Sequence, residues 1–515
     1  MADTKRVDPD YFPPMSGSAL WIAGGLLALA NFMAVLDTTI ANVSVPNIAG
    51  GLAVSPSQGT WVITSYAVAE AVTVPLTGWL ARRFGAVRVF IFAMLGFGLF
   101  SALCGLAPSL GVLVVCRIGQ GLAGGPMMPL SQTLLRRIFP ERLQGAALGL
   151  WGMTTVVGPI AGPLLGGMIC DNIGWPWVFY INVPIAVIAG YFTWRMMAPA
   201  ETKTERVPVD FIGLGLLITW IGAMQIMLDK GKDLDWFASP FIVTLAVIAA
   251  IGFAAFIIWE LTDEHPVVDL RIFRHGGFAT STLIMCLTFG AFFSSVVLIP
   301  LWLQTNLGYT AAWAGRVMAF QGVLAVVMSP IVARLLGKFD SRALVSFGVF
   351  VLAGVTMWRT GFESDIGFWN LALPQLAMGF AMPFFFLPLT GIALGSVDPQ
   401  ETASAAGLMN FMRTTAGAFG TSLTTTAWEN MGNARHADLA GSLNAPQQSL
   451  DLFQTLGLTA DQSLKQLDNM VQGQAVMLAT DKVFMICAVV FVIAALAMWI
   501  APKPRAMLGP GAGGH

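Results

Sequence analysis

Residues 158–167 read GPIAGPLLGG, and this stretch decides how the chain folds. Its two prolines and four glycines would break an isolated helix in water, yet residues 154–157 and 168–169 extend it as an uncharged run long enough to cross a bilayer. Small residues let a second helix approach closely, and neighbouring helices compensate for the hydrogen bond that each proline removes. The stretch therefore predicts a buried, bendable transmembrane helix with these packing residues: Gly158, Pro159, Gly162, Pro163, Gly166 and Gly167.

The composition of the whole chain also indicates a membrane protein. Apolar residues make up 56% of the 515 residues and charged residues only 11%, against about 25% charged in a typical soluble protein. The formal net charge is −1, and no basic block indicates binding to nucleic acid. The sequence contains no HExxH motif, phosphate-binding loop, nucleophile elbow or metal-spaced cysteine pair. We therefore expect neither an enzyme nor a cofactor or metal site.

Uncharged runs recur from end to end and predict an all-α integral membrane protein with fourteen transmembrane helices. Each run has the length that a hydrocarbon core of about 30 Å requires at about 1.5 Å per residue. The predicted spans are 19–45, 58–80, 87–106, 110–134, 144–168, 176–197, 210–229, 240–261, 278–304, 312–335, 343–360, 369–395, 402–428 and 480–501.

Lysine and arginine set the predicted orientation. With the N-terminus inside, eighteen of the 27 lysines and arginines fall in inner segments, six in outer segments and three within spans. Such an excess on one side follows the positive-inside rule. Both termini are therefore predicted to be cytoplasmic.

A weak internal repeat predicts how the spans are grouped. Residues 75–84, at the inner end of the second span, share a proline, a leucine, a cation and a phenylalanine with residues 330–339 at the inner end of the tenth. Two six-helix halves separated by a two-helix insert follow, an arrangement in which transporters bind substrate between the halves. The predicted parts are an N-terminal cytoplasmic tail at 1–18, a first half at 19–197, an insert at 198–262, a second half at 263–501 that includes a long periplasmic loop at 429–480, and a disordered cytoplasmic tail at 502–515.

Charges within the spans are the candidate functional residues, because each is costly in a bilayer unless it is paired or hydrated. From the helical rise, Asp37 in the first span lies about 12 Å from the outer surface and Arg117 in the fourth lies about 10 Å from it. The two side chains can therefore meet. A carboxylate that alternates between an arginine and a proton would couple transport to protons. A static ion pair, or separate hydrogen bonds, is the alternative.

Two further charges lie near mid-depth. Glu70 in the second span is about 18 Å from the outer end. In a hydrated cavity between the halves it would exchange a proton for a cationic substrate, whereas facing lipid it would be protonated and merely costly. Arg413 in the thirteenth span would balance the charge of the cavity or attract anions. Arg316, about 8 Å below the outer surface, can instead extend to water.

Several motifs together resemble the fourteen-span drug:proton antiporters of the EmrB type, within the major facilitator superfamily. Residues 36–43, LDTTIANV, are similar to the first-span signature of that group, and residues 117–121, RIGQG, to the fourth-span motif. The stretch 158–167 is similar to the fifth-span antiporter motif, and residues 175–184, WPWVFYINVP, are typical of the start of the sixth span. The resemblance covers nearly the whole chain.

The resemblance and the buried charges together give the expected functional residues. Proton coupling is expected at Asp37, Glu70 and Arg117, and the substrate cavity is expected at Asn42, Gln120, Asn410 and Arg413.

Residues 78–88 resemble the loop 2–3 motif of the superfamily, and the matching residues are Gly78, Arg82, Arg83, Gly85 and Arg88. The chain departs from the pattern Gly-x-Leu-Ala-Asp-Arg at Arg82, where the motif has an acidic gate residue. The motif of this chain therefore keeps the cations of the charge relay but not its acid. This basic variant is typical of the EmrB-type branch.

By resemblance, the protein would lie in the bacterial inner membrane, among membrane lipid, and exchange small hydrophobic substrates for protons. It would work with a periplasmic adaptor protein and an outer-membrane channel. The loop at 429–480 is either a docking surface for that adaptor or a solvated excursion, and its leucines indicate one or two short amphipathic helices. A transporter of a narrow metabolite class, such as a sugar or an organic acid, is the alternative with the same fold. A receptor or scaffold would not need the buried charges.

Overall fold

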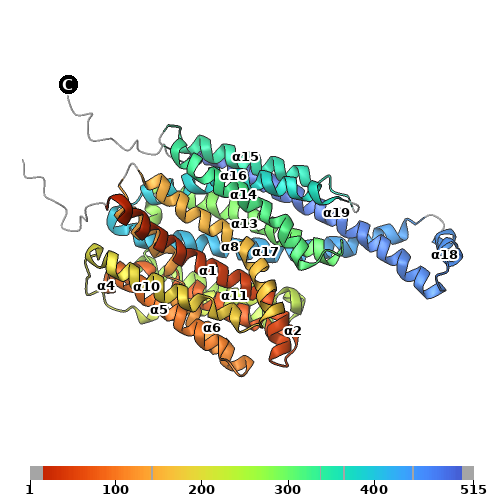
Figure 1. Cartoon of the computed structure of the whole chain (residues 1–515), viewed down its shortest axis with the longest axis horizontal. Helices are drawn as coiled ribbons and strands as arrows, with labels where there is room; N and C mark the ends of the chain where they lie inside the picture. The colour runs from red at the N-terminus through yellow and green to blue at the C-terminus, as the bar shows by residue number, and fades with distance from the viewer. Residues whose placement is uncertain (1–14, 141–142, 337, 364–365, 444–445, 502–515) are drawn as a thin grey trace, which may run out of the picture.

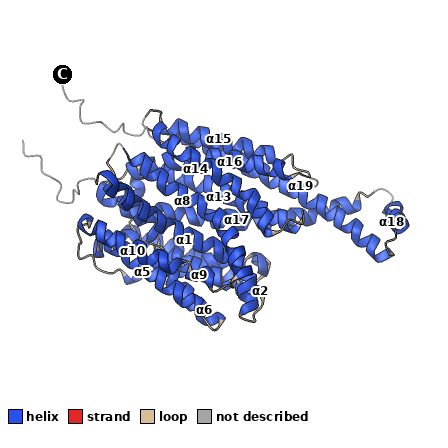
Figure 2. Ribbon diagram, viewed as in Figure 1, coloured by secondary structure: helices blue, strands red, loops and turns tan. Residues whose placement is uncertain are grey.

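The computed structural model describes residues 15–140, 143–336, 338–363, 366–443 and 446–501, and within these ranges every regular element is a helix (Figures 1 and 2). Nearly all of the predicted N-terminal tail and all of the C-terminal tail lie outside them. The helices of the first part are α1 (Gly17–Gly51), α2 (Pro56–Gly59), α3 (Trp61–Thr73), α4 (Thr77–Phe84), α5 (Ala86–Gly105), α6 (Leu110–Gly124), α7 (Met127–Ile138), α8 (Gln144–Asn172), α9 (Trp177–Tyr180) and α10 (Asn182–Met197).

The remaining helices follow after an extended segment. They are α11 (Phe211–Lys230), α12 (Pro240–Thr262), α13 (Gly276–Thr305), α14 (Ala311–Leu335), α15 (Ser341–Arg359), α16 (Phe368–Gly395), α17 (Thr402–Gly441), α18 (Pro446–Thr455) and α19 (Ala460–Ala497). Short 3₁₀ turns join several of them. Figure 1 shows these helices running roughly along one direction, as expected of a bundle that crosses a membrane.

Among the described residues, eleven helices are long and apolar enough to cross a membrane. The other three predicted spans, at 58–80, 144–168 and 402–428, coincide with α2 to α4, with α8 and with the first part of α17. The all-helical membrane fold is confirmed. The count of fourteen crossings stays a prediction.

Two of the predicted spans are interrupted. In the second span, α3 ends at Thr73 and α4 begins at Thr77, with Pro75 between them. The fourth changes from α6 to α7 across Gly125 and Pro126. Proline has no N–H to donate to the helix and crowds the turn before it. Each of these spans is therefore two helical segments rather than one continuous helix.

The segment predicted as a long outer loop, 429–480, is largely helical. The helix α17 continues to Gly441, and α19 begins at Ala460 and runs without interruption into the last span. Thr459 and Gln462 form a capping box at the start of α19, which fixes where this long helix begins. Figure 1 shows α18 and the adjoining part of α19 projecting beyond the other helices. Of the short helices expected here, α18 is one, whereas the other is the beginning of a long helix.

The two predicted halves meet at the end of the bundle that holds the first and last described residues, which we call the inner end. On one side α4 meets the start of α17, where a Cβ atom on Gly78 would lie 2.6 Å from the Cα atom of Ser404. On the other side α8 meets α14, where a Cβ atom on Gly145 would lie 2.8 Å from the carbonyl oxygen of Ala333. Glycine at these two positions lets the backbones pack against each other.

The helix α11, from the predicted insert, is bonded to the first half at its outer end. Lys230 Nζ lies 2.5 Å from the Thr60 hydroxyl, immediately before α3. Asp229 accepts a hydrogen bond from Thr64 of α3. Two polar contacts thus fix the outer end of α11 to the second span.

The same end of the insert is also bonded to the second half. Trp236 Nε1 donates to Thr426 Oγ1 of α17 at 2.9 Å, and Lys232 Nζ lies 3.1 Å from a Glu429 carboxylate oxygen of α17. The Ser422 hydroxyl of α17 donates to the backbone of α11 at 2.8 Å. The outer end of the insert therefore bridges the two halves.

Candidate functional site

Asp37 and Arg117, which the sequence predicted to be within reach, form an ion pair inside the first half. Arg117 Nη1 donates to Asp37 Oδ2 at 2.6 Å, and the exposed fractions of the two side chains are 0% for Arg117 and 1% for Asp37. The carboxylate comes from α1 and the guanidinium from α6. Their contact is confirmed, whereas a role in coupling stays a prediction.

Two amides complete the surroundings of Asp37. Gln120 Nε2 donates to Asp37 Oδ1 at 3.0 Å and Asn182 Nδ2 donates to the same oxygen at 2.7 Å. Both amides also donate to Ser101 Oγ, at 3.3 Å from Gln120 and 3.1 Å from Asn182. All these groups are buried, and they come from α1, α5, α6 and α10. We call Asp37, Ser101, Arg117, Gln120 and Asn182 the polar cluster.

A chain of contacts leads from the polar cluster to Glu70. Arg117 Nε donates to the carbonyl oxygen of Val62 at 3.0 Å, and its guanidinium lies 4.2 Å from the centre of the Tyr66 ring. The Tyr66 hydroxyl in turn donates to Glu70 Oε1 at 3.4 Å. Arg117 Nη2 has no hydrogen-bond partner among the described residues. The cluster is thus connected to the half-buried carboxylate on α3 through one aromatic ring.

The glycines of the 158–167 stretch hold α8 against α1, the helix that carries Asp37. A Cβ atom on Gly158 would lie 2.5 Å from a methyl carbon of Val35, and one on Gly162 would overlap Thr39. Thr39 Oγ1 also donates to the Gly158 carbonyl oxygen at 3.2 Å. A Cβ atom on Gly166 would be 3.4 Å from the backbone of α1, whereas one on Gly167 would meet nothing within 4 Å. The side chains of the two prolines, 159 and 163, lie outside the described part of the structure.

Arg413 lies where the two halves meet, among three aromatic rings. Its guanidinium carbon is 5.1 Å from the ring centre of Phe289 and 5.8 Å from those of Trp151 and Phe386. Trp151 belongs to α8 of the first half and stacks on Phe386 of the second at 5.5 Å between centroids. The Arg413 side chain is 4% exposed, its Nη2 lies 3.2 Å from Met128 Sδ, and its Nη1 has no hydrogen-bond partner in the described ranges. We call this group the Arg413 cage.

The remaining cavity candidates are separated. Asn410 Nδ2 donates to Gln132 Oε1 at 2.7 Å, a buried contact between α17 and α7 that links the halves. Asn42 is exposed on α1, five residues beyond Asp37. Gln120 belongs to the polar cluster rather than to the Arg413 cage. The predicted cavity residues therefore fall in three places instead of lining one surface.

The loop 2–3 motif packs against the segment that follows α10. Gly85 has φ +93°, which allows a tight turn between α4 and α5, and Arg82 accepts a backbone hydrogen bond from residue 205. Arg83 donates to the backbone carbonyl of residue 207. Arg88 lies 3.7 Å from Glu201, whose carboxylate also accepts the backbone N–H groups of residues 87 and 88. The acid that faces this motif comes from Glu201 instead of position 82.

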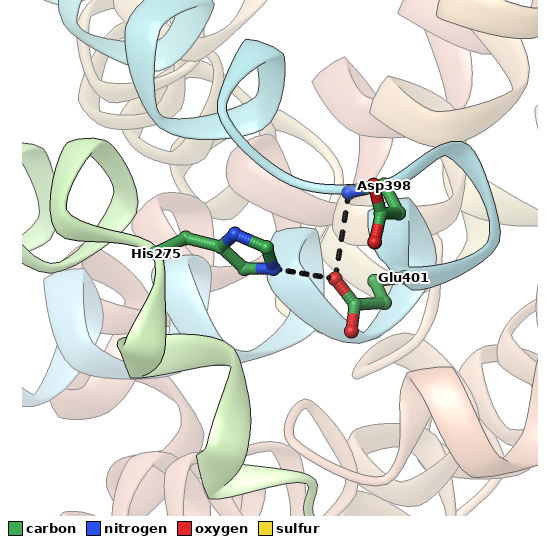
Figure 3. A group of neighbouring side chains, drawn as sticks. All are labelled: His275, Asp398 and Glu401. Carbon is green, nitrogen blue, oxygen red and sulfur yellow. Dashed lines mark hydrogen bonds and ion pairs between the residues drawn. The ribbon is translucent and has the colours of Figure 1, made fainter.

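A cluster of His275, Asp398 and Glu401 lies at the inner end, where α13 begins next to the turn between α16 and α17 (Figure 3). Glu401 accepts from His275 Nε2 at 2.9 Å and from Arg274 at 2.7 Å, and it also accepts the backbone N–H of Asp398. One ring nitrogen of His275 and one carboxylate oxygen from each of Asp398 and Glu401 lie within 4.8 Å of one another. Since an arginine already occupies one oxygen of Glu401, the arrangement serves as an ion-pair network that orders the start of α17.

Several of these positions were not singled out from the sequence. Ser101 and Tyr66 are uncharged, and the role of Asn182 depends on where the start of α10 lies relative to α1. The predicted orientation places Arg359 in an outer segment, yet this residue is 0% exposed and donates to Ser295 Oγ at 2.6 Å and to Gln375 Oε1 at 3.0 Å. No local pattern marks these contacts in advance.

Comparison with known proteins agrees with this architecture. The chain is 43% identical over 507 residues to the multidrug export protein EmrB of Escherichia coli K12, covering 98% of this chain and 99% of that protein. It is 43% identical over 511 residues to the fatty acid resistance protein FarB of Neisseria gonorrhoeae, covering 98% and 100%. Among solved structures, the proton:xylose symporter XylE is similar in fold, with a TM-score of 0.59 and 14% identity over 95% of this chain and 97% of that one.

The human organic anion transporter MFSD10 is similar to the same extent, with a TM-score of 0.58 and 13% identity over 93% of this chain and 98% of that one. The sequence pattern that defines the Major Facilitator Superfamily matches residues 27–421 of this chain. These residues run from α1 into α17 and so include the polar cluster and the Arg413 cage. With a match over most of its length and full-length bacterial relatives at 43% identity, the chain belongs to the Major Facilitator Superfamily of membrane transporters.

Proposed function

We propose that this protein exports hydrophobic drugs and toxic compounds across the bacterial inner membrane in exchange for protons, by alternating access between two six-helix halves. Relatives named for multidrug export and for fatty acid resistance match it over nearly its whole length. The observation that carries the proton-coupled part is the connection from the buried Asp37–Arg117 pair through Tyr66 to Glu70.

The two carboxylates have different surroundings and take different roles in this mechanism. Asp37 accepts hydrogen bonds from three side chains, namely Arg117, Gln120 and Asn182. Glu70 accepts one long hydrogen bond, at 3.4 Å, and is only half-buried. A proton reaches Glu70 without breaking a network, so Glu70 is the exchanging group. Asp37 holds Arg117 in place, and Arg117 adjusts the charge that Glu70 experiences.

The Arg413 cage is the proposed substrate contact. Its three rings are 0–2% exposed where the halves meet, and when the halves separate in the proposed cycle they would form an apolar surface that accepts compounds of different shapes. The guanidinium lies between elements of both halves. A transporter for a sugar would instead line this place with hydrogen-bonding groups matched to one ligand. Export of many lipophilic compounds, rather than of one metabolite, is therefore the function that the cage favours.

The test compares Glu70→Gln with Glu264→Gln, an exposed carboxylate near the inner end. In proteoliposomes with an imposed pH gradient, we expect Glu70→Gln to lose gradient-driven drug transport by at least about tenfold, and the control to transport as the unmodified protein does. A panel of lipophilic cations, anions, neutral drugs and sugars measures substrate breadth. Unchanged gradient-driven transport by Glu70→Gln would contradict the role of this residue, and transport of sugars alone would support the narrow alternative.

The proposed topology is fourteen crossings grouped as six, two and six, with both termini cytoplasmic. The division is 19–197, 198–262 and 263–501, between tails at 1–18 and 502–515. Single cysteines placed at residues 204 and 457 and labelled with a membrane-impermeant reagent test it. Residue 457 is expected to react from the periplasmic side and residue 204 only after the membrane is opened. The reverse pattern would rule out this orientation.

We also propose that the projecting helices α18 and α19 contact a periplasmic adaptor that leads to an outer-membrane channel. Leu452 and Leu456 on this projection are 58% and 71% exposed, and two neighbouring exposed leucines fit a surface that a partner covers. Replacing both with Ser should leave proteoliposome transport unchanged and lower drug resistance in cells that supply the adaptor. Full resistance in such cells would exclude this surface as the adaptor contact.

A further inference from the structure

A cavity of about 450 Å³ lies on the flank of the first half at the inner end, apart from the polar cluster and the Arg413 cage. The end of α4, the first turns of α5 and the end of α6 line it, and Thr204 of the extended segment closes one side. A second hollow of about 410 Å³ adjoins it and shares Arg83 and Phe84. Neither hollow is needed for the export mechanism.

The inner rim of this cavity is cationic. Arg83 and Arg88 line the larger hollow and Arg206 the smaller one. Residues 82–88 and 201–206 together contain five cations and two carboxylates. The rim therefore attracts an anion.

Arg88 has one loose ion-pair partner among the described residues. It lies in the first turn of α5, where the helix dipole disfavours a cation, and its side chain is 67% exposed. The carboxylate next to it, Glu201, lies 3.7 Å away and is already bonded to the backbone N–H groups of residues 87 and 88. An additional anion would give this arginine a partner of its own.

The remaining wall of the cavity is apolar and exposed on the outer surface of the helix bundle. Phe84, Phe92 and Leu122 line the cavity with exposed fractions of 48%, 74% and 46%. Exposed apolar side chains continue from here along the same helices, on α5 at Leu95 and Leu99. A small soluble anion would leave this apolar surface unused, whereas an acyl chain would cover it.

We propose that this cavity binds an anionic phospholipid of the inner leaflet, with its phosphate between Arg83 and Arg88 and its acyl chains along α5 and α6. The site lies at the level where a headgroup belongs, because the predicted orientation places this rim at the cytoplasmic surface. Arg83 uses one N–H for the carbonyl of residue 207 and stacks near Phe84 at 5.7 Å, which holds its guanidinium at the rim. The opposite face of α4 packs against α17 at Gly78, so the bound lipid adjoins the contact between the halves.

The experiment measures lipid binding to the purified full-length protein in detergent, by native mass spectrometry and by the rise in Tm on adding lipid. The probes are phosphatidylglycerol, phosphatidylcholine with the same acyl chains, and glycerol 3-phosphate as the headgroup alone. We expect phosphatidylglycerol to bind at least about tenfold more tightly than phosphatidylcholine, and glycerol 3-phosphate to leave Tm unchanged. Equal effects of the two lipids would overturn the proposal, and so would stabilisation by glycerol 3-phosphate equal to that by phosphatidylglycerol.

Two double variants localise the site. Arg83→Gln with Arg88→Gln should weaken phosphatidylglycerol binding by about 25-fold, because each cation near an anionic headgroup contributes about a factor of five. The control, Arg195→Gln with Arg334→Gln, removes the same charge from two exposed arginines at other inner helix ends and should change binding less than about twofold. Equal losses in both would mean that net charge, and not this cavity, attracts the lipid. If the first variant does not fold, Arg83→Lys with Arg88→Lys keeps the charges and should still favour phosphatidylglycerol over phosphatidylcholine. Loss of that preference would also overturn the proposal.

Discussion

Replacing Asp37 with Asn tests whether the polar cluster is built around an ion pair. The substitution keeps the shape of the side chain and removes its charge, while Arg117 stays buried at 0% exposure. Its guanidinium would keep the Val62 carbonyl at 3.0 Å and Gln120 Oε1 at 2.8 Å, neither of which is charged. Breaking a buried pair by removing one partner costs about 3–5 kcal/mol, since the other charge is left uncompensated. We expect a loss of stability of that size.

The double variant Asp37→Asn with Arg117→Gln separates this cost from the loss of ordinary hydrogen bonds. With both charges gone, the remaining cost is that of a few neutral hydrogen bonds, about 1–2 kcal/mol in total. The double variant should therefore be more stable than the single variant Asp37→Asn. Such a reversal is specific to a buried pair, because two independent losses would add.

Unfolding in mixed micelles with increasing denaturing detergent, followed by tryptophan fluorescence, gives the stabilities. The matched control is the pair Arg435–Asp438, which spans 3.6 Å with both side chains more than half exposed. Asp438→Asn should change stability little, because exposed pairs are screened by water. If Asp37→Asn is as mild as the control, or if the double variant is the least stable of all, the ion pair does not organise the cluster.

Three further outcomes follow from other contacts. Gly162→Leu should lower the free energy of unfolding by about 1–3 kcal/mol and lower export in proteoliposomes by at least about tenfold, because the leucine side chain would overlap α1. Gly167→Leu is the control, since a Cβ atom there meets nothing within 4 Å, and it should change neither stability nor export. Arg413→Gln should reduce transport of anionic substrates about tenfold more than transport of neutral substrates, and Arg413→Lys should keep most of the transport of anionic substrates. Equal losses for anionic and neutral substrates would show that the charge of Arg413 is not used. Lys232→Glu should slow export about two- to fivefold in the same assay, and the double variant Lys232→Glu with Glu429→Lys should export at the original rate. If the double variant stays slow, the 3.1 Å contact between these two residues is not used in transport.

The span positions and the Asp37–Arg117 contact could be predicted from sequence for physical reasons. A bilayer needs about 20 apolar residues per helix, so hydrophobic runs locate the helices. Buried charges need partners, and the helical rise places both groups at a similar depth. The helical rise predicts how deep a residue lies in the membrane, but it does not predict which way the residue faces around the helix axis. For this reason Asn42 and Gln120, which were expected in one cavity, lie apart in this structure, the first exposed on α1 and the second buried in the polar cluster.

Other contacts depend on packing between distant segments. Glu201 supplies the carboxylate near Arg88 from 113 residues away, a relation that no local spacing encodes. Arg359 occurs at the outer end of a span, where an arginine can equally extend to water or turn inward, and neighbours on α13 and α16 decide the outcome. The region after residue 428 is polar enough to resemble a loop, yet capping at Thr459 and contacts along α19 make most of it helical. Sequence patterns locate elements better than they locate partners.

The bridging position of α11 gives the two-helix insert a definite place in the proposed transport cycle. Halves that rock about a central site must change their separation at the outer end, and there the insert is bonded to both. Its bonds to the first half, through Asp229 and Lys230, are short, partly buried and made by charged groups. On the side of the second half, Lys232 and Glu429 are 39% and 50% exposed, and the two part-buried hydrogen bonds, from Trp236 to Thr426 and from Ser422 to the backbone of α11, are neutral. An exposed pair and neutral hydrogen bonds break at lower cost than partly buried hydrogen bonds of charged groups. The insert is therefore expected to move with the first half and to exchange its contacts with α17, so that cross-linking it to α3 would be tolerated and cross-linking it to α17 would stop export.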